Sequence, residues 1–159
     1  MQNLKNSSQR VQDILSQHNL EIKVIEFQEL TRTAQEAACV IGCEVGQIAK
    51  TLIFKGKNSG KPVCVIASGC NKVDEKKIAA LVAEPIERPD ADYVLKSTGF
   101  VIGGIPPLGY QFDIPPFIDE DLMGYSEIWA AAGTPYSVFK ITPHDLLNIT
   151  QGTLTYLKN

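Results

Sequence analysis

The fold is decided by the stretch Gln47-Ile48-Ala49-Lys50-Thr51-Leu52-Ile53-Phe54-Lys55 and by the apolar run that follows it, Val63-Cys64-Val65-Ile66-Ala67. Both are rich in β-branched and other apolar residues, which favour strands. The segment between them, Gly56–Lys61, is polar and contains two glycines, which is typical of a hairpin connection. We therefore predict two paired strands that reach the core, preceded by a short helical turn over residues 45–49.

Upstream of this hairpin the pattern becomes helical. Apolar residues spaced i, i+3, i+4, i+7 over residues 11–18 predict an amphipathic helix, and residues 22–27 then predict a strand. The sequence Thr33-Ala34-Gln35-Glu36 is a capping box that opens a second helix. Gly42 is placed to end that helix in a left-handed conformation.

Downstream of the hairpin, short helices give way to strands. Asp74 is placed to cap a helix that runs through Leu81, and Pro89-Asp90 to begin another that ends near Lys96. Further strands are predicted at about 110–113, 116–118, 126–131 and 136–141. Thr142 and Pro143 then have the residue types of an N-cap and a first helical position. Early helices, late strands and one βαβ-like crossover predict an α+β fold, with a single domain built on a curved mixed sheet.

Length and composition limit what the chain can be. Its 159 residues suit one domain, and 44% apolar with 21% charged residues is a globular composition, which excludes disordered and collagen-like classes. No apolar run approaches the roughly 18 residues of a membrane-spanning helix, and the polar N-terminus lacks an apolar signal core. We expect a cytoplasmic monomer with no membrane contact. Its domain should cover residues 8–150, with flexible termini at 1–7 and 151–159.

Charge is unevenly distributed along the chain. The net charge is −3, from 15 basic and 18 acidic residues, which excludes a uniformly basic nucleic-acid binder. Residues 50–96, however, hold nine basic and six acidic residues. This middle segment is therefore the part expected to meet a phosphate.

The four cysteines do not form a metal motif. Their spacings, C-x3-C for Cys39 and Cys43 and C-x5-C for Cys64 and Cys70, differ from the C-x2-C knuckles of zinc ribbons. We expect buried, inert thiols, no metal and no cofactor. A Cys–His hydrolase stays as an alternative that requires one of the two histidines to lie near a thiol in the fold.

Two features could carry chemistry. Lys50 begins an apolar strand, where its ammonium could bind a phosphate or stabilise an oxyanion, or could simply extend into solvent. The loop Gly103-Gly104-Ile105-Pro106-Pro107 could present consecutive N–H groups to an anion, or could be a turn that the fold requires. No helix and no Gly-Lys-Ser/Thr follows this loop, which excludes Rossmann and Walker A interpretations.

Three stretches occur in the order and spacing of one known family. They are Gln47–Phe54, Thr98-Gly99-Phe100-Val101-Ile102-Gly103-Gly104-Ile105-Pro106-Pro107-Leu108-Gly109 and Glu127-Ile128-Trp129-Ala130-Ala131-Ala132-Gly133-Thr134-Pro135. Over residues 8–150 the chain resembles the YbaK/ProRS-associated domains, also called the INS-like editing domains of prolyl-tRNA synthetase. The resemblance implies a trans-editing deacylase that hydrolyses the ester of mischarged tRNA, of the tRNA(Pro) type and carrying a small wrong amino acid.

The resemblance also implies roles for individual residues. Lys50 corresponds to the family lysine, which would hold the terminal adenosine phosphate or position the 3′ end. Gly103 to Pro107 correspond to the GXXXP loop, in which the amides of Gly103, Gly104 and Ile105 would polarise the scissile carbonyl. A water molecule, aided by the vicinal hydroxyl of the tRNA, would then attack without any metal.

Further substrate-binding candidates follow from the resemblance and flank these motifs: Thr31, Arg32, Thr33, Thr98, Pro107, Gly133 and Tyr136. Thr33 is also the expected helix N-cap. Tyr136 departs from the family pattern, in which histidine or asparagine often follows the proline, so the specificity of this chain could differ. The expected partner is the acceptor end of aminoacyl-tRNA, with a synthetase as a further candidate. The alternative function is a non-catalytic module that binds tRNA ends or nucleotides.

Overall fold

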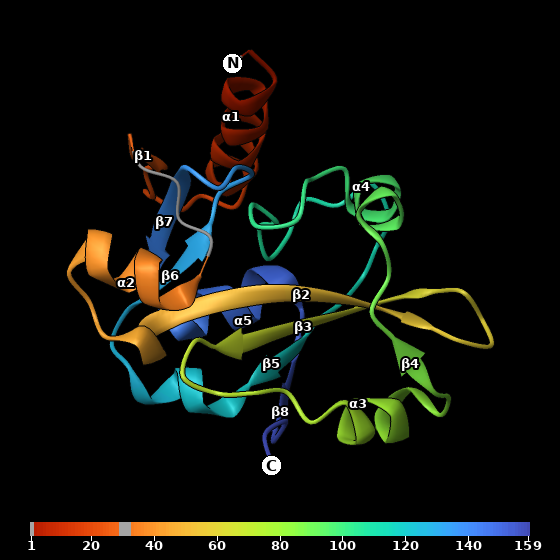
Figure 1. Ribbon diagram of the computed structural model, residues 1–159. Helices are drawn as coiled ribbons and strands as arrows, with labels where there is room; N and C mark the ends of the chain where they lie inside the picture. The colour runs from red at the N-terminus through yellow and green to blue at the C-terminus, as the bar shows by residue number, and fades with distance from the viewer. Residues whose placement is uncertain (1, 29–32) are drawn as a thin grey trace.

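Figure 1 shows the computed structural model, which describes residues 2–28 and 33–159. Across these residues one mixed sheet has the strand order β1-β7-β6-β2-β3-β5-β8, and β4 pairs with β2 outside this path. The strands are β1 Ile25–Glu26, β2 Ile48–Gly56, β3 Pro62–Ser68, β4 Ile86–Glu87, β5 Phe117–Asp119, β6 Ile128–Ala131, β7 Ser137–Ile141 and β8 Thr153–Thr155. The helices are α1 Gln2–Gln17, α2 Ala34–Ile41, α3 Glu75–Val82, α4 Ala91–Thr98 and α5 Pro143–Thr150, with single 3₁₀ turns at Val45–Gln47 (η1) and Glu120–Gly124 (η2). The expected single α+β domain is confirmed.

The predicted hairpin lies at the centre of the sheet. Strands β2 and β3 pair antiparallel from Ala49↔Ser68 to Lys55↔Pro62. On the outer side of the hairpin, β3 pairs in parallel with β5 and β2 pairs in parallel with β6. Parallel and antiparallel neighbours around one long hairpin give the mixed sheet that the βαβ-like connection predicted.

Both faces of the hairpin are buried, which explains its nearly continuous apolar sequence. On one face Phe54, Val63 and Val65 pack in a cluster that includes Ile78 of α3. On the other face lies the larger core, to which α1, α5 and the segment around residues 100–108 contribute. Because side chains alternate along a strand, β3 supplies every second residue to each cluster.

Local helix signals are confirmed in the structure. The side chains of Thr33, Asp74, Asp90 and Thr142 each accept a hydrogen bond from a backbone N–H in the first turn of the helix that follows. Gly42 ends α2 in a left-handed conformation, with φ of 83°. These caps act within one turn of the chain, so local sequence was enough to find them.

Several expectations are wrong. Residues 110–113 form no strand, with bends at 111 and 112, and Tyr110 directs its hydroxyl to the carbonyl oxygen of Pro106 at 2.6 Å. The C-terminal residues 151–159 are not loose, because β8 pairs with β5 and Leu157 is fully buried. The boundary expected at residue 8 falls inside α1, which begins at Gln2.

None of the described helices is both long enough and apolar enough to span a membrane.

Candidate functional site

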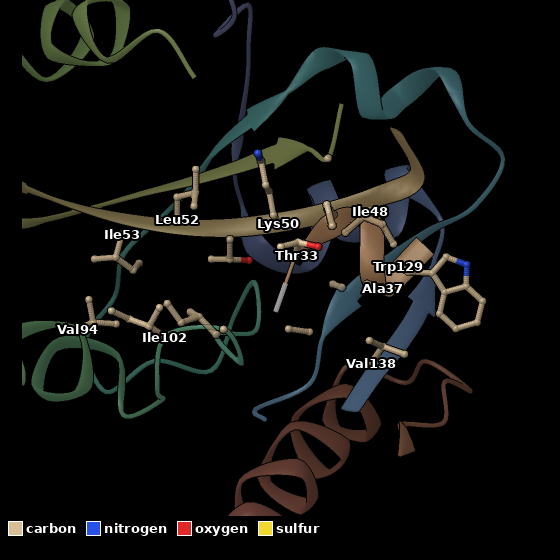
Figure 2. A pocket seen from close by; sticks show the side chains of 18 of the residues that line it. Thr33, Ala37, Ile48, Lys50, Leu52, Ile53, Val94, Ile102, Trp129 and Val138 are labelled. Atoms are coloured by element: carbon tan, nitrogen blue, oxygen red, sulfur yellow. The ribbon is translucent and has the colours of Figure 1, made fainter. Parts of the chain in front are cut away.

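A cavity of about 500 Å³ opens beside the middle of β2. Its wall combines β2 with the start of α2, the loop at residues 102–105 and the neighbouring ends of β6 and β7. Figure 2 shows these segments, which are far apart in the sequence, meeting around the strand.

The cavity exists because strand pairing is interrupted on one side of β2. Pairing with β6 ends at Ala49↔Ala130, and pairing with β4 begins only at Lys55. Residues 50–54 of β2 therefore have a partner strand on the β3 side alone. This leaves a gap of about five residues in an otherwise continuous sheet.

The backbone at this gap is open for hydrogen bonding. Gly69 donates its N–H to the carbonyl of Ile48 at 2.7 Å, and Gly56 donates to the carbonyl of Lys61 at 2.9 Å. Backbone groups alternate in direction along an antiparallel strand, so Thr51 and Ile53 turn theirs away from β3. The cavity is thus walled by the open edge of a strand, which offers donors and acceptors to a bound molecule.

Lys50 lies at this edge with a half-buried side chain. Its ammonium makes no hydrogen bond or ion pair with any residue that the structure describes. Burial lowers the pKa of Lys50, and the positive charge of Arg88 lowers it further. A lysine in these surroundings is an unpaired cation, available to an anionic group.

Side chains leave β2 on two opposite sides. Figure 2 shows Lys50 and Leu52 extending from one side of the strand, while Ile53 extends from the other side, towards Ile102 and Val94. The cavity thus has a cationic side at Lys50 and an apolar side facing the 102–105 loop. A ligand that crosses the open edge contacts both sides.

The glycines of the 102–105 loop have different roles. Gly103 is exposed, lines the cavity and has φ of 91°, a conformation that favours glycine. Gly104 is buried and fixes the loop, because its N–H donates to Val101 and its carbonyl accepts from Gly133 at 2.9 Å. The amide of Gly104 is therefore already committed, contrary to the expectation of three available amides.

Two loop amides remain available. Gly103 and Ile105 both line the cavity, and their N–H groups donate to no acceptor among residues 2–28 and 33–159. Ile105 also buries its side chain in the larger core, which anchors the loop. Two anchored N–H donors at one cavity wall can bind an oxyanion.

Of the candidates in the α2 region, Thr33 reaches the cavity. Its hydroxyl is also the predicted cap, because it accepts from Glu36 N–H at 3.1 Å and lies 3.2 Å from Glu36 Oε1. Thr31 and Arg32 lie outside the described residues.

The other four candidates do not line the cavity: Thr98, Pro107, Gly133 and Tyr136. Thr98 is fully buried and donates to the carbonyl of Val94 at 2.7 Å, which closes the end of α4. A Cβ on Gly133 would lie 2.7 Å from the carbonyl oxygen of Ser7, so this glycine permits α1 to approach the β6–β7 turn. The structure therefore gives Thr98 and Gly133 roles in packing around the site.

Two residues that line the cavity were not among the site residues predicted from the sequence. Thr51 lines the wall directly after Lys50, and its hydroxyl is buried without a hydrogen-bond partner. Arg88 reaches the cavity from the segment after β4. Because side chains alternate along a strand, the sequence could have indicated that Thr51 lies on the opposite side of the strand from Lys50. No local pattern indicates that Arg88 lies close to residue 50.

The wall of this cavity contains no cysteine, histidine, aspartate or glutamate among the described residues. Cys64 is buried as expected, and burial raises the pKa of its thiol to about 12. Cys39 and Cys70 are exposed, which contradicts the expectation of buried thiols. Among the described residues, no three histidine, cysteine or acidic side chains cluster in a way that could hold a metal ion.

Known proteins resemble this chain over most of its length. The family described as an aminoacyl-tRNA editing domain matches residues 28–149. A protein of Enterococcus faecalis named "Putative Cys-tRNA(Pro)/Cys-tRNA(Cys) deacylase EbsC" is 30% identical over 87% of this chain and 86% of its own. A proline–tRNA ligase of Caldicellulosiruptor bescii is 31% identical over 77% of this chain, which corresponds to 23% of the ligase.

A solved structure described as a "putative trans-editing enzyme for prolyl tRNA synthetase" is 42% identical to this chain. The two superpose with a TM-score of 0.90, over 96% of this chain and 97% of the other. Family match, sequence and fold agree over most of the chain, so this protein belongs to the aminoacyl-tRNA editing domain family.

Proposed function

We propose that this protein is a trans-editing deacylase that hydrolyses the ester of a mischarged tRNA of the tRNA(Pro) type, which carries a small wrong amino acid. It would act as a monomer on the acceptor end. The family and the names of the relatives support this proposal. The observation that carries it is the open edge of β2, which has an unpaired lysine on one side and two available loop amides near the other.

Each side of the edge suits one part of such a substrate. The Lys50 ammonium binds the phosphate of the terminal adenosine, since no carboxylate lines the described part of the wall. On the other side, apolar residues such as Ile53, Val94 and Ile105 surround the amino acid. The ester bond between the two parts then crosses the strand edge, close to the loop.

The chemistry requires little more than orientation. Water adds to the ester carbonyl carbon, and the N–H groups of Gly103 and Ile105 stabilise the oxyanion that forms. The intermediate then expels the 3′ oxygen of the ribose, which takes up a proton and leaves a free amino-acid carboxylate. Because no histidine or carboxylate lines the described part of the wall, the vicinal ribose hydroxyl positions the water.

A deacylation panel tests this function. The purified protein is mixed with tRNA(Pro) charged with alanine, cysteine, serine or proline, and loss of the ester is followed. We expect hydrolysis of a wrong amino acid with proline spared. Lys50→Ala should reduce kcat/KM roughly 10- to 100-fold, because it removes a charge-assisted contact to the phosphate that contributes about 1.5–3 kcal/mol.

Lys57→Ala is the matched control, because Lys57 is an exposed lysine in the hairpin turn and does not line the cavity. Its deacylation rate should equal that of the unchanged protein. Equal rates for the Lys50 and Lys57 variants would refute the role of Lys50.

One observation favours a second candidate, a module that binds tRNA ends without turnover. The cavity has binding groups, but no cysteine, histidine or carboxylate among the described side chains of its wall. Salt-dependent binding of tRNA with every ester left intact would support this module and refute the deacylase.

A further inference from the structure

Arg88 is a second cation of the same cavity, and no role follows for it from the proposed mechanism. It enters the wall from the segment between β4 and α4, whereas Lys50 comes from β2. No acidic residue lines the described part of the wall, and the carboxylate that pairs with Arg88, that of Glu75, lies outside it. The charged side chains that line this part of the wall are Lys50 and Arg88, both positive, so the cavity favours an anionic ligand that contacts both.

The guanidinium of Arg88 is oriented by Glu75 of α3. Nε and Nη2 of Arg88 lie 3.4 Å and 3.3 Å from the same oxygen, Oε2 of Glu75. This contact uses one edge of the planar group. Nη1 makes no hydrogen bond with any described residue, so the guanidinium keeps donors for a ligand.

The ion pair is poorly suited to a structural role. The side chain of Arg88 is 70% exposed and that of Glu75 is 40% exposed. Exposed pairs of this kind contribute at most about 1 kcal/mol to stability. Orientation of the arginine is therefore the more consequential effect of Glu75.

We propose that Arg88 binds a second backbone phosphate of the tRNA acceptor end, next to the phosphate held by Lys50. This inference rests on the proposed function, because it assigns another contact to the same ligand. Two like charges in one cavity repel each other, and a strand with one negative charge per nucleotide relieves that repulsion at both positions. The planar guanidinium also matches the geometry of a phosphate, to which it can donate two parallel hydrogen bonds.

Binding of an uncharged acceptor-stem hairpin with a single-stranded 3′ end tests this proposal without any chemistry. Fluorescence anisotropy at several salt concentrations gives the affinity and its salt slope for each variant. Arg88→Ala should weaken binding roughly ten-fold at low salt, as expected for a charge-assisted hydrogen bond. It should also reduce the slope of log K against log salt by about 0.7, the value for one single-strand phosphate contact.

Three further variants separate this role from general charge effects. Arg88→Lys should keep the salt slope and lose part of the affinity, because it retains charge without the planar fork. Glu75→Gln should weaken binding less than Arg88→Ala, since it removes only the orienting group. Lys57→Ala should match the unchanged protein, because that lysine lies outside the cavity.

Deacylation by the same variants distinguishes the two proposals. Arg88→Ala should lower kcat/KM by the same factor for every aminoacyl group and leave kcat unchanged, because phosphate binding does not sense the amino acid. An unaltered salt slope in Arg88→Ala, or no binding of the hairpin by the unchanged protein, would overturn the role of Arg88. A reduced slope in a protein that hydrolyses no ester would keep that role and refute the deacylase.

Discussion

Replacing Gly104 by alanine tests whether the 102–105 loop is held in place by close contact between two backbones. A Cβ on Gly104 would lie 2.6 Å from Cα, 2.7 Å from C and 2.8 Å from N of Thr134. All three are backbone atoms, which cannot rotate away as the end of a side chain can. The added methyl group must therefore move the loop away from the β6–β7 turn.

The magnitude follows from two terms. Forcing one extra carbon into a packed site costs about 1–3 kcal/mol. Separating the two segments also weakens the hydrogen bond from Gly133 N–H to the Gly104 carbonyl, which contributes about 1 kcal/mol. We expect Gly104→Ala to lower the free energy of unfolding by about 2–4 kcal/mol.

Urea unfolding followed by circular dichroism measures this loss, and two glycines provide matched controls. Gly124→Ala should change stability by less than about 0.5 kcal/mol, because its Cβ meets open space. Gly103→Ala has its nearest atom at 3.8 Å, so its expected cost of about 1–2 kcal/mol comes from the positive φ alone. If the free energies of unfolding of Gly104→Ala and Gly124→Ala differ by less than about 0.5 kcal/mol, close contact between the two backbones does not hold the loop in place.

Three other changes have defined outcomes. Thr51→Val should raise the free energy of unfolding by about 1 kcal/mol in urea titrations, because it removes a buried hydroxyl that has no partner; a loss of stability would contradict this. The pKa of Lys50 is lowered in the folded state, so the unfolded chain binds more protons between that pKa and 10.5, and stability should rise with pH through this window. Lys50→Met should lack that rise in urea titrations repeated across the window, and an identical pH profile would refute the assignment. Alkylation of the exposed Cys39 and Cys70 should leave deacylation unchanged, since neither lines the cavity, whereas loss of activity would revive a thiol mechanism.

Sequence reasoning succeeded where the determining interactions are local. The β2–β3 hairpin depends on apolar composition and on a polar turn between the strands. The helix caps at Thr33 and Thr142 act within three residues. Lys50 and Gly103 were found from motifs, and the structure places both on one cavity.

Sequence reasoning failed where contacts between distant segments determine the structure. Residues 110–113 resemble a strand in composition, but no neighbouring strand pairs with them in the described structure. Residues 153–155 form β8 because they pair with the edge of β5 that β3 does not occupy. The role of Gly104 depends on Thr134, thirty positions later, and no local pattern reports such a contact.

The α+β class, the central hairpin and the residue types available for phosphate and oxyanion binding can all be predicted from the sequence, because periodicity and capping act over a few residues. Where those residues meet depends on contacts between segments that are distant in the chain. Parallel pairing of β2 with β6 stops after two residue pairs, and this opens the edge that Lys50, Arg88 and the 102–105 loop surround. The point at which two strands separate depends on the packing of the whole sheet, so the site is a property of the fold and not of any one motif.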